Sequence, residues 1–407
     1  MERYVSKLIA DDLKRKLVFV TGPRQVGKTT LSQELGQTRL PSQYLNYDIA
    51  SDRATIRRQS WKPDLKLLVL DELHKMDGWK PWLKGVIDGR PAGQQILVTG
   101  SARMDTFRQT GESLAGRYLS WRLHPFSVKE LCDAGPLDFN AQLSDAALKE
   151  ASGSKAGRRK TALKPDAALT HLLQRGGFPE PCLLLDDVQA DRWRDQYANG
   201  LVREDVLEFS RLQEVGAMRL LLDLLRNRVG SPLSLASLAR DLGLSQPTVK
   251  RYIDILQALY IVFTVQPWHR NIARSLLQAP KLYFFDNGMV AGDSLEAEGA
   301  RFENAVAVML LKHVHFLQDS AAKPVDLHYV RTKEGAEIDF ALSSGKTLTH
   351  LIECKWADSS PHPAFRKITP MWPKAEAIQL VRHLRNDEER HEVRISQAAP
   401  WLAGLAA

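Results

Sequence analysis

The chain has 407 residues, of which 44% are hydrophobic and 26% are charged, with a formal net charge of +8. This length predicts two to three domains with their own cores, and the basic balance favours a polyanionic partner such as DNA. The three cysteines show no metal-ligand spacing, which argues against a disulfide framework or a zinc site. No N-terminal signal pattern and no apolar run of about eighteen residues is present, so we expect a cytoplasmic protein that does not cross a membrane.

The first informative segment is residues 22–29, Gly-Pro-Arg-Gln-Val-Gly-Lys-Thr, between the apolar run 17–20 and a helical pattern. A phosphate-binding loop needs this order of strand, loop and helix, because backbone N–H groups and the helix N-terminus must face the phosphates. Lys28 would reach the β and γ phosphate oxygens, and Thr29 would hold Mg²⁺. We therefore expect ATP at Gly22, Pro23, Arg24, Gln25, Val26, Gly27, Lys28, Thr29 and Thr30.

Two acids follow the next aliphatic strand. Residues 67–70, Leu-Leu-Val-Leu, are typical of a buried parallel strand, and Asp71 and Glu72 come directly after them. Carboxylates at the carboxyl end of such a strand lie at the ligand edge of the sheet. We expect Asp71 to hold Mg²⁺ through its water shell and Glu72 to polarise the water that attacks the γ-phosphate. A solvated strand end is the alternative, and the matching phosphate loop disfavours it.

A third strand, residues 95–99, runs into Gly-Ser-Ala-Arg, and its polar end would fall between the first two motifs. Ser101 is therefore the candidate sensor of the γ-phosphate, with Thr99 as the alternative. Further strands are expected at 44–48 and 118–123. Strands that alternate with helices in this way predict a parallel sheet.

At this point the chain resembles the AAA-type ATPases. The stretches that carry the resemblance are Leu-Asp-Glu-Leu-His-Lys-Met-Asp-Gly-Trp (70–79), Thr-Gly-Ser-Ala-Arg (99–103), Glu-Ser-Leu-Ala-Gly-Arg-Tyr (112–118) and Leu-His-Pro-Phe-Ser (123–127). They resemble a prokaryotic AAA-type family that carries a C-terminal domain of unknown function. The resemblance assigns 1–132 to the ATPase core and implies ATP hydrolysis with Mg²⁺ in a homo-oligomer. It makes Arg117 the candidate arginine finger, in its own or a neighbouring subunit, with Arg103 or a simple ion-pairing role as alternatives.

Behind the core, residues 133–168 have the low hydrophobicity of a flexible linker. Its basic cluster Gly-Ser-Lys-Ala-Gly-Arg-Arg-Lys (153–160) could touch nucleic acid, although a solvated linker is the simpler interpretation. The helical pattern of residues 169–230 is similar to the lid that normally follows an ATPase core.

Residues 231–281 have the pattern of a winged helix-turn-helix. A short amphipathic helix at 235–242 is followed by a turn and a second helix capped by Ser245, and residues 261–266 would form the wing. The buried stripe of the second helix is expected at Val249, Ile253, Leu256 and Tyr260. Its outward N-terminal residues, which are the candidate DNA contacts, are Gln246, Thr248, Lys250 and Arg251. Winged helices also serve as ATPase lids and protein-docking modules, so those alternatives stay open.

Residues 282–407 contain a strong helix at 301–311 and two strand-like runs. Asp339, Glu353 and Lys355, with Glu303 on the helix, resemble the PD-(D/E)xK nuclease constellation. On adjacent strands Asp339 and Glu353 would converge on a divalent metal, and Lys355 would orient the attacking water. The resemblance implies a restriction-endonuclease-like domain with metal-dependent deoxyribonuclease activity. The same sheet could also be a binding platform without turnover.

The sequence thus predicts an α/β protein: a P-loop AAA-type parallel-sheet domain, a helical lid, a winged helix-turn-helix and a C-terminal α/β nuclease-like domain. One functional hypothesis is a Mg²⁺-dependent ATPase that couples ATP binding and hydrolysis to DNA binding or remodelling. The alternative is a regulatory NTPase switch, similar to signalling ATPases of the STAND type, that controls a protein partner and uses its C-terminal region only as a binding platform.

Overall fold

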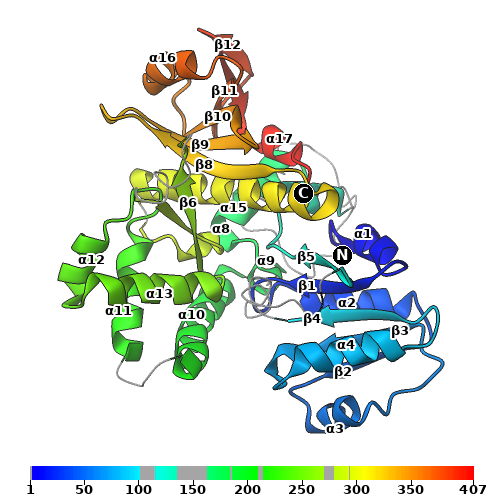
Figure 1. The fold of residues 1–407 in the computed structure, drawn as a ribbon. Helices are drawn as coiled ribbons and strands as arrows, with labels where there is room; N and C mark the ends of the chain where they lie inside the picture. Colours follow the sequence, from blue (N-terminus) through cyan, green and yellow to red (C-terminus); the bar gives the residue numbers. More distant parts are fainter. Residues whose placement is uncertain are drawn as a thin grey trace. The chain divides into compact units, whose positions relative to one another are not determined.

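The computed structural model describes residues 2–100, 114, 116–134, 163–183, 186–209, 214–269, 279–292 and 294–407 (Figure 1). Ser101, Arg103 and most of the expected linker lie outside the described residues. The chain forms two compact units, Met1–His124 with Ala258–Tyr260 and Pro125–Gln257 with Ile261–Ala407. None of the helices in the described ranges is long and apolar enough to cross a membrane.

The first unit is built on a five-stranded parallel sheet in the order β2-β3-β4-β1-β5. Its strands are β1 (Leu17–Thr21), β2 (Ser42–Asn46), β3 (Leu67–Asp71), β4 (Gln95–Thr99) and β5 (Tyr118–Arg122). All side chains of β1 and β3 are buried, as expected for strands covered on both faces. Strand β4 lies between β1 and β3, so its last residue, Thr99, lies between the strands that carry the first two motifs.

Helices cover both faces of this sheet. They are α1 (Ser6–Asp12), α2 (Lys28–Gln37), α3 (Ala50–Arg58) and α4 (Trp79–Gly89), with a short 3₁₀ turn η1 (Leu73–Lys75) after β3. On one face Phe19 of β1 meets Trp79 of α4 edge to face, with ring centroids 6.0 Å apart, and Leu83 completes that core. Helix α2 packs against β3 and β4.

The second unit begins with helices. They are α6 (Val128–Asp133), α8 (Pro165–Arg175), α9 (Pro179–Leu183), α10 (Asp187–Phe209) and α11 (Glu214–Arg226), followed by α12 (Leu235–Leu242) and α13 (Gln246–Ala258). Ser234 caps α12, and Ser245 accepts a hydrogen bond from the N–H of Thr248 at 3.3 Å, which confirms the expected cap of α13. Tyr260 was expected on the buried stripe of α13 and is not, because α13 ends at Ala258 and Tyr260 adopts a positive φ of 56°. Tyr252 is fully buried and fills the stripe instead.

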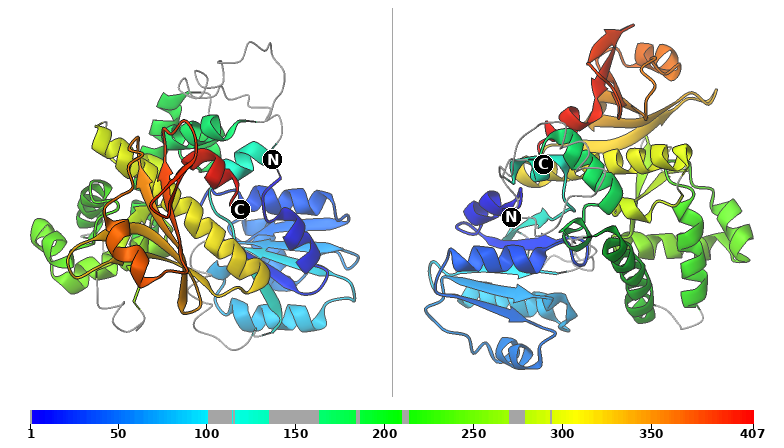
Figure 2. Two further views of the ribbon diagram at one scale, coloured as in Figure 1. Left: turned by 90° about the horizontal axis from the view of Figure 1, so that it is seen from above. Right: turned by 180° about the vertical axis from the view of Figure 1, so that it is seen from behind.

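An eight-stranded sheet with the order β12-β13-β11-β10-β9-β8-β6-β7 forms the rest of the second unit. Its strands are β6 (Val262–Pro267), β7 (Lys281–Phe284), β8 (Val325–Arg331), β9 (Glu337–Ser344), β10 (Thr347–Lys355), β11 (Glu376–Val381), β12 (Glu388–Arg390) and β13 (Val393–Gln397). The remaining elements are η4 (Asn287–Met289), α15 (Leu295–Ala321), α16 (Ala364–Ile368), η5 (Thr369–Met371) and α17 (Ala398–Ala403). The long helix α15 packs against β7, β8 and β10 (Figure 2).

The hairpin after α13 is continuous with this C-terminal sheet. Strand β6 pairs antiparallel with β7 and parallel with β8. Strand β7 spans the boundary at 281/282 that the sequence suggests, so the two expected modules share one sheet. The expected divisions at 132, 168, 230 and 281 stay predictions.

Candidate functional site

The loop between β1 and α2 has the backbone that a phosphate-binding loop needs. Gly22 has a φ of +149°, and a Cβ there would lie 2.3 Å from the carbonyl oxygen of Leu123, so only glycine fits. Gly27 has a φ of 97° and precedes the first residue of α2. The ammonium group of Lys28 is buried and donates to the carbonyls of Gly22 and Pro23 at 2.9 and 2.6 Å.

The other expected loop residues differ in exposure. Val26 is buried, Arg24 is half-buried, and Gln25 and Thr30 are exposed. The carbonyl of Val26 accepts a hydrogen bond from Arg3 at 2.8 Å, and Arg3 also donates to the carbonyl of His124. Sequence reasoning missed Arg3, because a single arginine so far from the loop in sequence carries no motif.

The two expected magnesium ligands face each other. The hydroxyl of Thr29 donates to Asp71 Oδ2 at 2.9 Å, and Asp71 is 2% exposed at the carboxyl end of β3. Tyr44, which the sequence did not single out, donates to the same Oδ2 at 2.5 Å, and the hydroxyl of Thr99 donates to Oδ1. Burial and the neighbouring Asp71 raise the pKa of Tyr44 above its usual value, so its hydroxyl stays protonated. The Thr29 hydroxyl and the Asp71 carboxylate are oxygen donors of the kind that Mg²⁺ prefers, so the residues present fit this ion.

Glu72 lies at the same edge of the sheet in a strained backbone conformation. Its φ is 55°, which is unusual for a non-glycine residue and is common at functional sites. Its carboxylate is 3.6 Å from His74 Nε2 and 3.7 Å from Lys75 Nζ. Burial raises the pKa of Glu72, although the charges of Lys28 and Lys75 oppose the shift. A carboxylate with a raised pKa is suited to accept a proton from water.

Fewer contacts in the structure support the sensor and arginine-finger assignments. Thr99 belongs to the Asp71 network, whereas Ser101 lies outside the described residues. Arg117 has a side chain 37% exposed, with Nε 3.2 Å from Asp88 Oδ1, so within its own unit it is an ion-pairing arginine. Its role as a finger stays a prediction.

The four acids and bases expected in the C-terminal domain come together. Strands β9 and β10 are antiparallel neighbours, and the N–H of Asp339 donates to Glu353 Oε2 at 3.2 Å. Lys355 Nζ donates to Glu353 Oε1 at 2.7 Å. Glu303 on α15 accepts a hydrogen bond from the hydroxyl of Tyr283 at 2.7 Å.

A second lysine, which sequence reasoning missed, lies in this cluster. Lys281 begins β7, its side chain is 1% exposed, and its Nζ lies 2.8 Å from Glu337, 3.1 Å from Asp339 and 3.5 Å from Glu303. Burial alone would lower the pKa of Lys281, but the charges of Glu303, Asp339 and Glu337 outweigh it and raise this pKa. An isolated lysine before the apolar run Leu-Tyr-Phe-Phe is a weak signal, because nothing in the sequence pairs it with acids further along the chain.

In the structure these acids surround Lys281 and are not arranged around a metal ion. Within the ranges that the structure covers, no group of three or more His, Cys, Asp or Glu side chains could hold one. Burial and the charge of Asp339 raise the pKa of Glu303 to about 7 and that of Glu353 to about 8. The cluster is a network of acids and two lysines of the same chain, and we derive no hydrolytic step from it.

The candidate DNA contacts lie at the N-terminal end of α13. Gln246, Lys250 and Arg251 are exposed. Thr248 is half-buried, and its hydroxyl is 2.8 Å from that of Ser245, so it belongs to the helix cap. The guanidinium of Arg251 lies 5.6 Å from the ring centroid of Tyr252.

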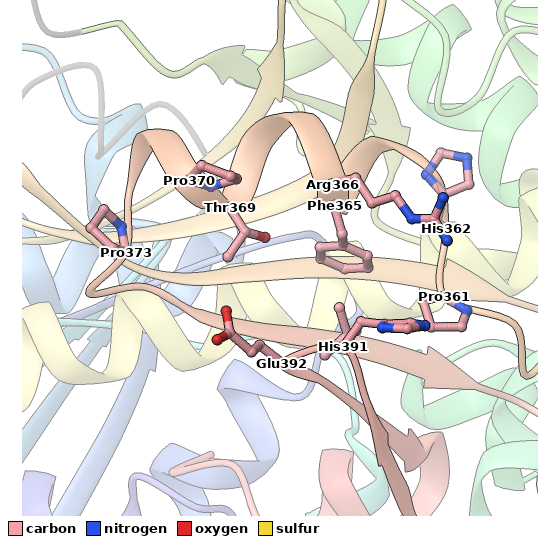
Figure 3. A pocket seen from close by; sticks show the side chains of 10 residues that line it. Pro361, His362, Phe365, Arg366, Thr369, Pro370, Pro373, His391 and Glu392 are labelled. Carbon is pink, nitrogen blue, oxygen red and sulfur yellow. The ribbon is translucent and has the colours of Figure 1, made fainter.

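A pocket of about 270 Å³ lies beside α16, and none of the expected metal, phosphate or DNA contacts lines it (Figure 3). Phe365 and Val393 supply apolar surface, and Arg366, His391 and Glu392 supply charge and polarity. His391 and Glu392 form the turn between β12 and β13, both with positive φ.

Three family models match separate parts of the chain. An AAA domain matches residues 14–132, one domain of unknown function (DUF8612) matches 166–296, and another (DUF4143) matches 298–400. The N-terminal part is therefore an AAA-type P-loop ATPase domain, and DUF4143 forms the C-terminal part.

Relatives with similarity over most of the chain are uncharacterised proteins. One from Mycobacterium tuberculosis is 27% identical over 334 residues, which are 79% of this chain and 66% of that protein. The chain thus spans slightly less than two thirds of that relative. One from Methanocaldococcus jannaschii is 21% identical and covers 83% of this chain and 75% of that protein.

Two solved structures are similar at low identity. A RuvB variant of Thermotoga maritima is 15% identical with a TM-score of 0.34, covering 64% of this chain and 88% of that chain. A Walker-type ATPase of Pyrococcus abyssi is 16% identical with a TM-score of 0.39, covering 63% and 89%.

Proposed function

We propose that this chain is a Mg²⁺-dependent ATPase that couples ATP binding and hydrolysis to the binding or remodelling of DNA. The observation that carries the proposal is the meeting of the Thr29 hydroxyl, the Asp71 carboxylate and the buried Lys28 ammonium at one edge of a parallel sheet. The AAA-domain match over the same residues supports it.

Each residue of the site has a distinct role in this proposal. Lys28 exchanges the carbonyls of Gly22 and Pro23 for phosphate oxygens when ATP enters. The Thr29 hydroxyl and Asp71 would hold Mg²⁺, and the ion would supply positive charge to the phosphates. Glu72 accepts a proton from the attacking water.

Two more elements complete the site. Thr99, or Ser101 beyond it, senses the γ-phosphate. Arg117 completes a nucleotide site within a homo-oligomer, which would release it from Asp88.

The DNA part of the proposal rests on α12, α13 and the β6–β7 hairpin acting as a winged helix-turn-helix. Gln246, Lys250 and Arg251 are exposed where a recognition helix meets the major groove. The formal net charge of +8 favours a polyanion in the cytoplasm. We propose that the C-terminal sheet is a second DNA-binding surface. Its acids are neutralised by lysines of the same chain, so they would not repel the phosphates of DNA.

The alternative is a regulatory switch that controls a protein partner, with the C-terminal region as a binding platform only. The neutralised acid cluster is compatible with that alternative as well. The two functions differ in one measurable respect, since only the first predicts that DNA changes the rate of ATP hydrolysis.

The test measures ATP hydrolysis with single-stranded, duplex and branched DNA at two salt concentrations. We expect stimulation by at least one DNA form, with DNA affinity falling steeply as salt rises. A Lys250→Ala/Arg251→Ala variant should reduce the slope of log affinity against log salt by about one for each phosphate that the variant no longer neutralises. The matched control, Arg15→Ala/Lys16→Ala, removes the same charge from exposed positions of the ATPase unit and should leave the slope unchanged. Hydrolysis that ignores every DNA form would favour the regulatory switch.

A further inference from the structure

We propose that Lys281 is the resident cation of the C-terminal acid cluster, defined as Glu303, Glu337, Asp339 and Glu353. The cluster then holds neighbouring elements of the fold together by ion pairs, without a metal ion. This inference goes beyond the ATPase proposal and does not depend on it.

The first argument is the position of the ammonium group. Lys281 Nζ lies within 3.5 Å of Glu303, Glu337 and Asp339, which come from α15 and β9. These are ion-pair distances, so one ammonium group is the counter-charge of three carboxylates. A divalent ion placed among the same three acids would have to displace a lysine that is 1% exposed.

The second argument is that the carboxylate oxygens already have partners. Asp339 Oδ1 meets Lys281, and its Oδ2 accepts the N–H of Cys354 at 3.0 Å. Glu353 Oε1 meets Lys355, and its Oε2 accepts the N–H of Asp339. A metal ion here would therefore have to compete with two lysine ammonium groups, whereas the side chains that donate to Asp71 at the candidate ATP site are neutral hydroxyls.

Glu337 is occupied in the same way. Its Oε1 meets Lys281 at 2.8 Å, and its Oε2 lies 3.2 Å from Arg331. Glu303 Oε1 accepts the Tyr283 hydroxyl at 2.7 Å and lies 3.5 Å from Lys281 Nζ. The oxygens of the cluster that face Lys281 are therefore already paired within the protein.

The third argument is what the cluster connects. Strands β7 and β9 are not neighbours in the sheet, because β6 and β8 lie between them. Lys281 joins β7 to β9 and to α15 through side chains alone. It also joins the region that matches DUF8612 to the region that matches DUF4143. These ion pairs thus fix the hairpin that follows α13, β6 and β7, to the C-terminal part of the sheet.

The test counts bound Mn²⁺ by electron paramagnetic resonance, with the EDTA-treated full chain and no nucleotide. Wild type and Asp339→Asn should bind the same number of ions. Lys281→Ala should gain one Mn²⁺ per chain, because the three acids lose their internal cation, and Lys281→Ala/Asp339→Asn should lose it again. Lys346→Ala, which removes an exposed lysine from the turn between β9 and β10, should match wild type. All variants keep Thr29 and Asp71, so any ion at the ATP site cancels in the comparison.

Two results would overturn the proposal. One is a wild-type Mn²⁺ site that disappears in Asp339→Asn, which would show that the metal displaces Lys281. The other is a folded Lys281→Ala protein that gains no Mn²⁺. If Lys281→Ala does not fold, the comparison of wild type with Asp339→Asn decides the question by itself.

Discussion

Replacement of Lys312 by methionine should strongly destabilise the second unit. Lys312 lies on α15, its side chain is 1% exposed, and its ammonium donates to the Pro125 carbonyl at 3.0 Å and to the Ser127 hydroxyl at 3.2 Å. It also pairs with Glu130, which is 5% exposed. Methionine keeps the apolar stem but leaves the Glu130 carboxylate buried without its cation.

Breaking a buried ion pair by removing one partner costs about 3–5 kcal/mol. Each kcal/mol lowers Tm by about 2–4 °C in a domain of roughly this size, so we expect a loss of about 6–20 °C. Lys312→Met/Glu130→Leu should recover most of the loss, because an apolar pair can replace a buried ion pair at little cost. Thermal unfolding supplies Tm, and hydrogen exchange should show the loss of protection in α6 and α15. The exposed Lys323→Met is the control. A Lys312→Met protein within about 2 °C of wild type, or a double variant no more stable than the single one, would refute the reasoning.

Three further predictions concern single positions. Gly22→Ala should weaken ATP binding at least about tenfold, because its Cβ would clash with the backbone beyond β5 and shift the loop. The control Gly85→Ala lies in open space within α4 and should leave ATP binding unchanged, and calorimetric titration compares the two. Lys28→Ala should weaken ATP binding about 100-fold, since it removes charge-assisted hydrogen bonds to phosphate that are worth about 1.5–3 kcal/mol each, and the same titration checks this. Burial lowers the pKa of His171, so below pH 6.5 the unfolded chain binds a proton that the folded chain does not, and the free energy of unfolding should fall as pH falls. Denaturant titrations should give a smaller fall for His171→Gln than for wild type. Equal pH slopes for the two proteins would contradict this prediction.

The residues of the candidate phosphate site could be predicted from the sequence because its pattern is local. Residues 22–29 are one continuous segment, made of the loop up to Gly27 and the first two residues of α2, and Asp71 ends a strand whose aliphatic run marks it as buried. The parallel order of the sheet then brings Thr29 and Asp71 together. Tyr44 could not be foreseen, because its role depends on β2 lying beside β3, which no local pattern specifies.

The C-terminal cluster shows the limit of motif reasoning. The spacing of Asp339, Glu353 and Lys355 correctly placed them on neighbouring strands, as the register of β9 and β10 shows. The spacing of these residues does not indicate which positive charge balances the acids, because Lys281 lies on a strand 58 residues away from Asp339. Long-range ion pairs of this kind carry no signature in a single sequence.

The most direct test of the central claim compares ATP binding with single-turnover ATP hydrolysis in wild type and Glu72→Gln, in the presence of Mg²⁺. Glu72 is placed to act on the attacking water alone, so we expect ATP affinity to remain within a few-fold of wild type. Hydrolysis should fall by about 100-fold or more, the usual contribution of a general base. A Glu72→Gln protein that hydrolyses ATP at the wild-type rate, or a wild-type protein that binds ATP and never hydrolyses it, would contradict the account.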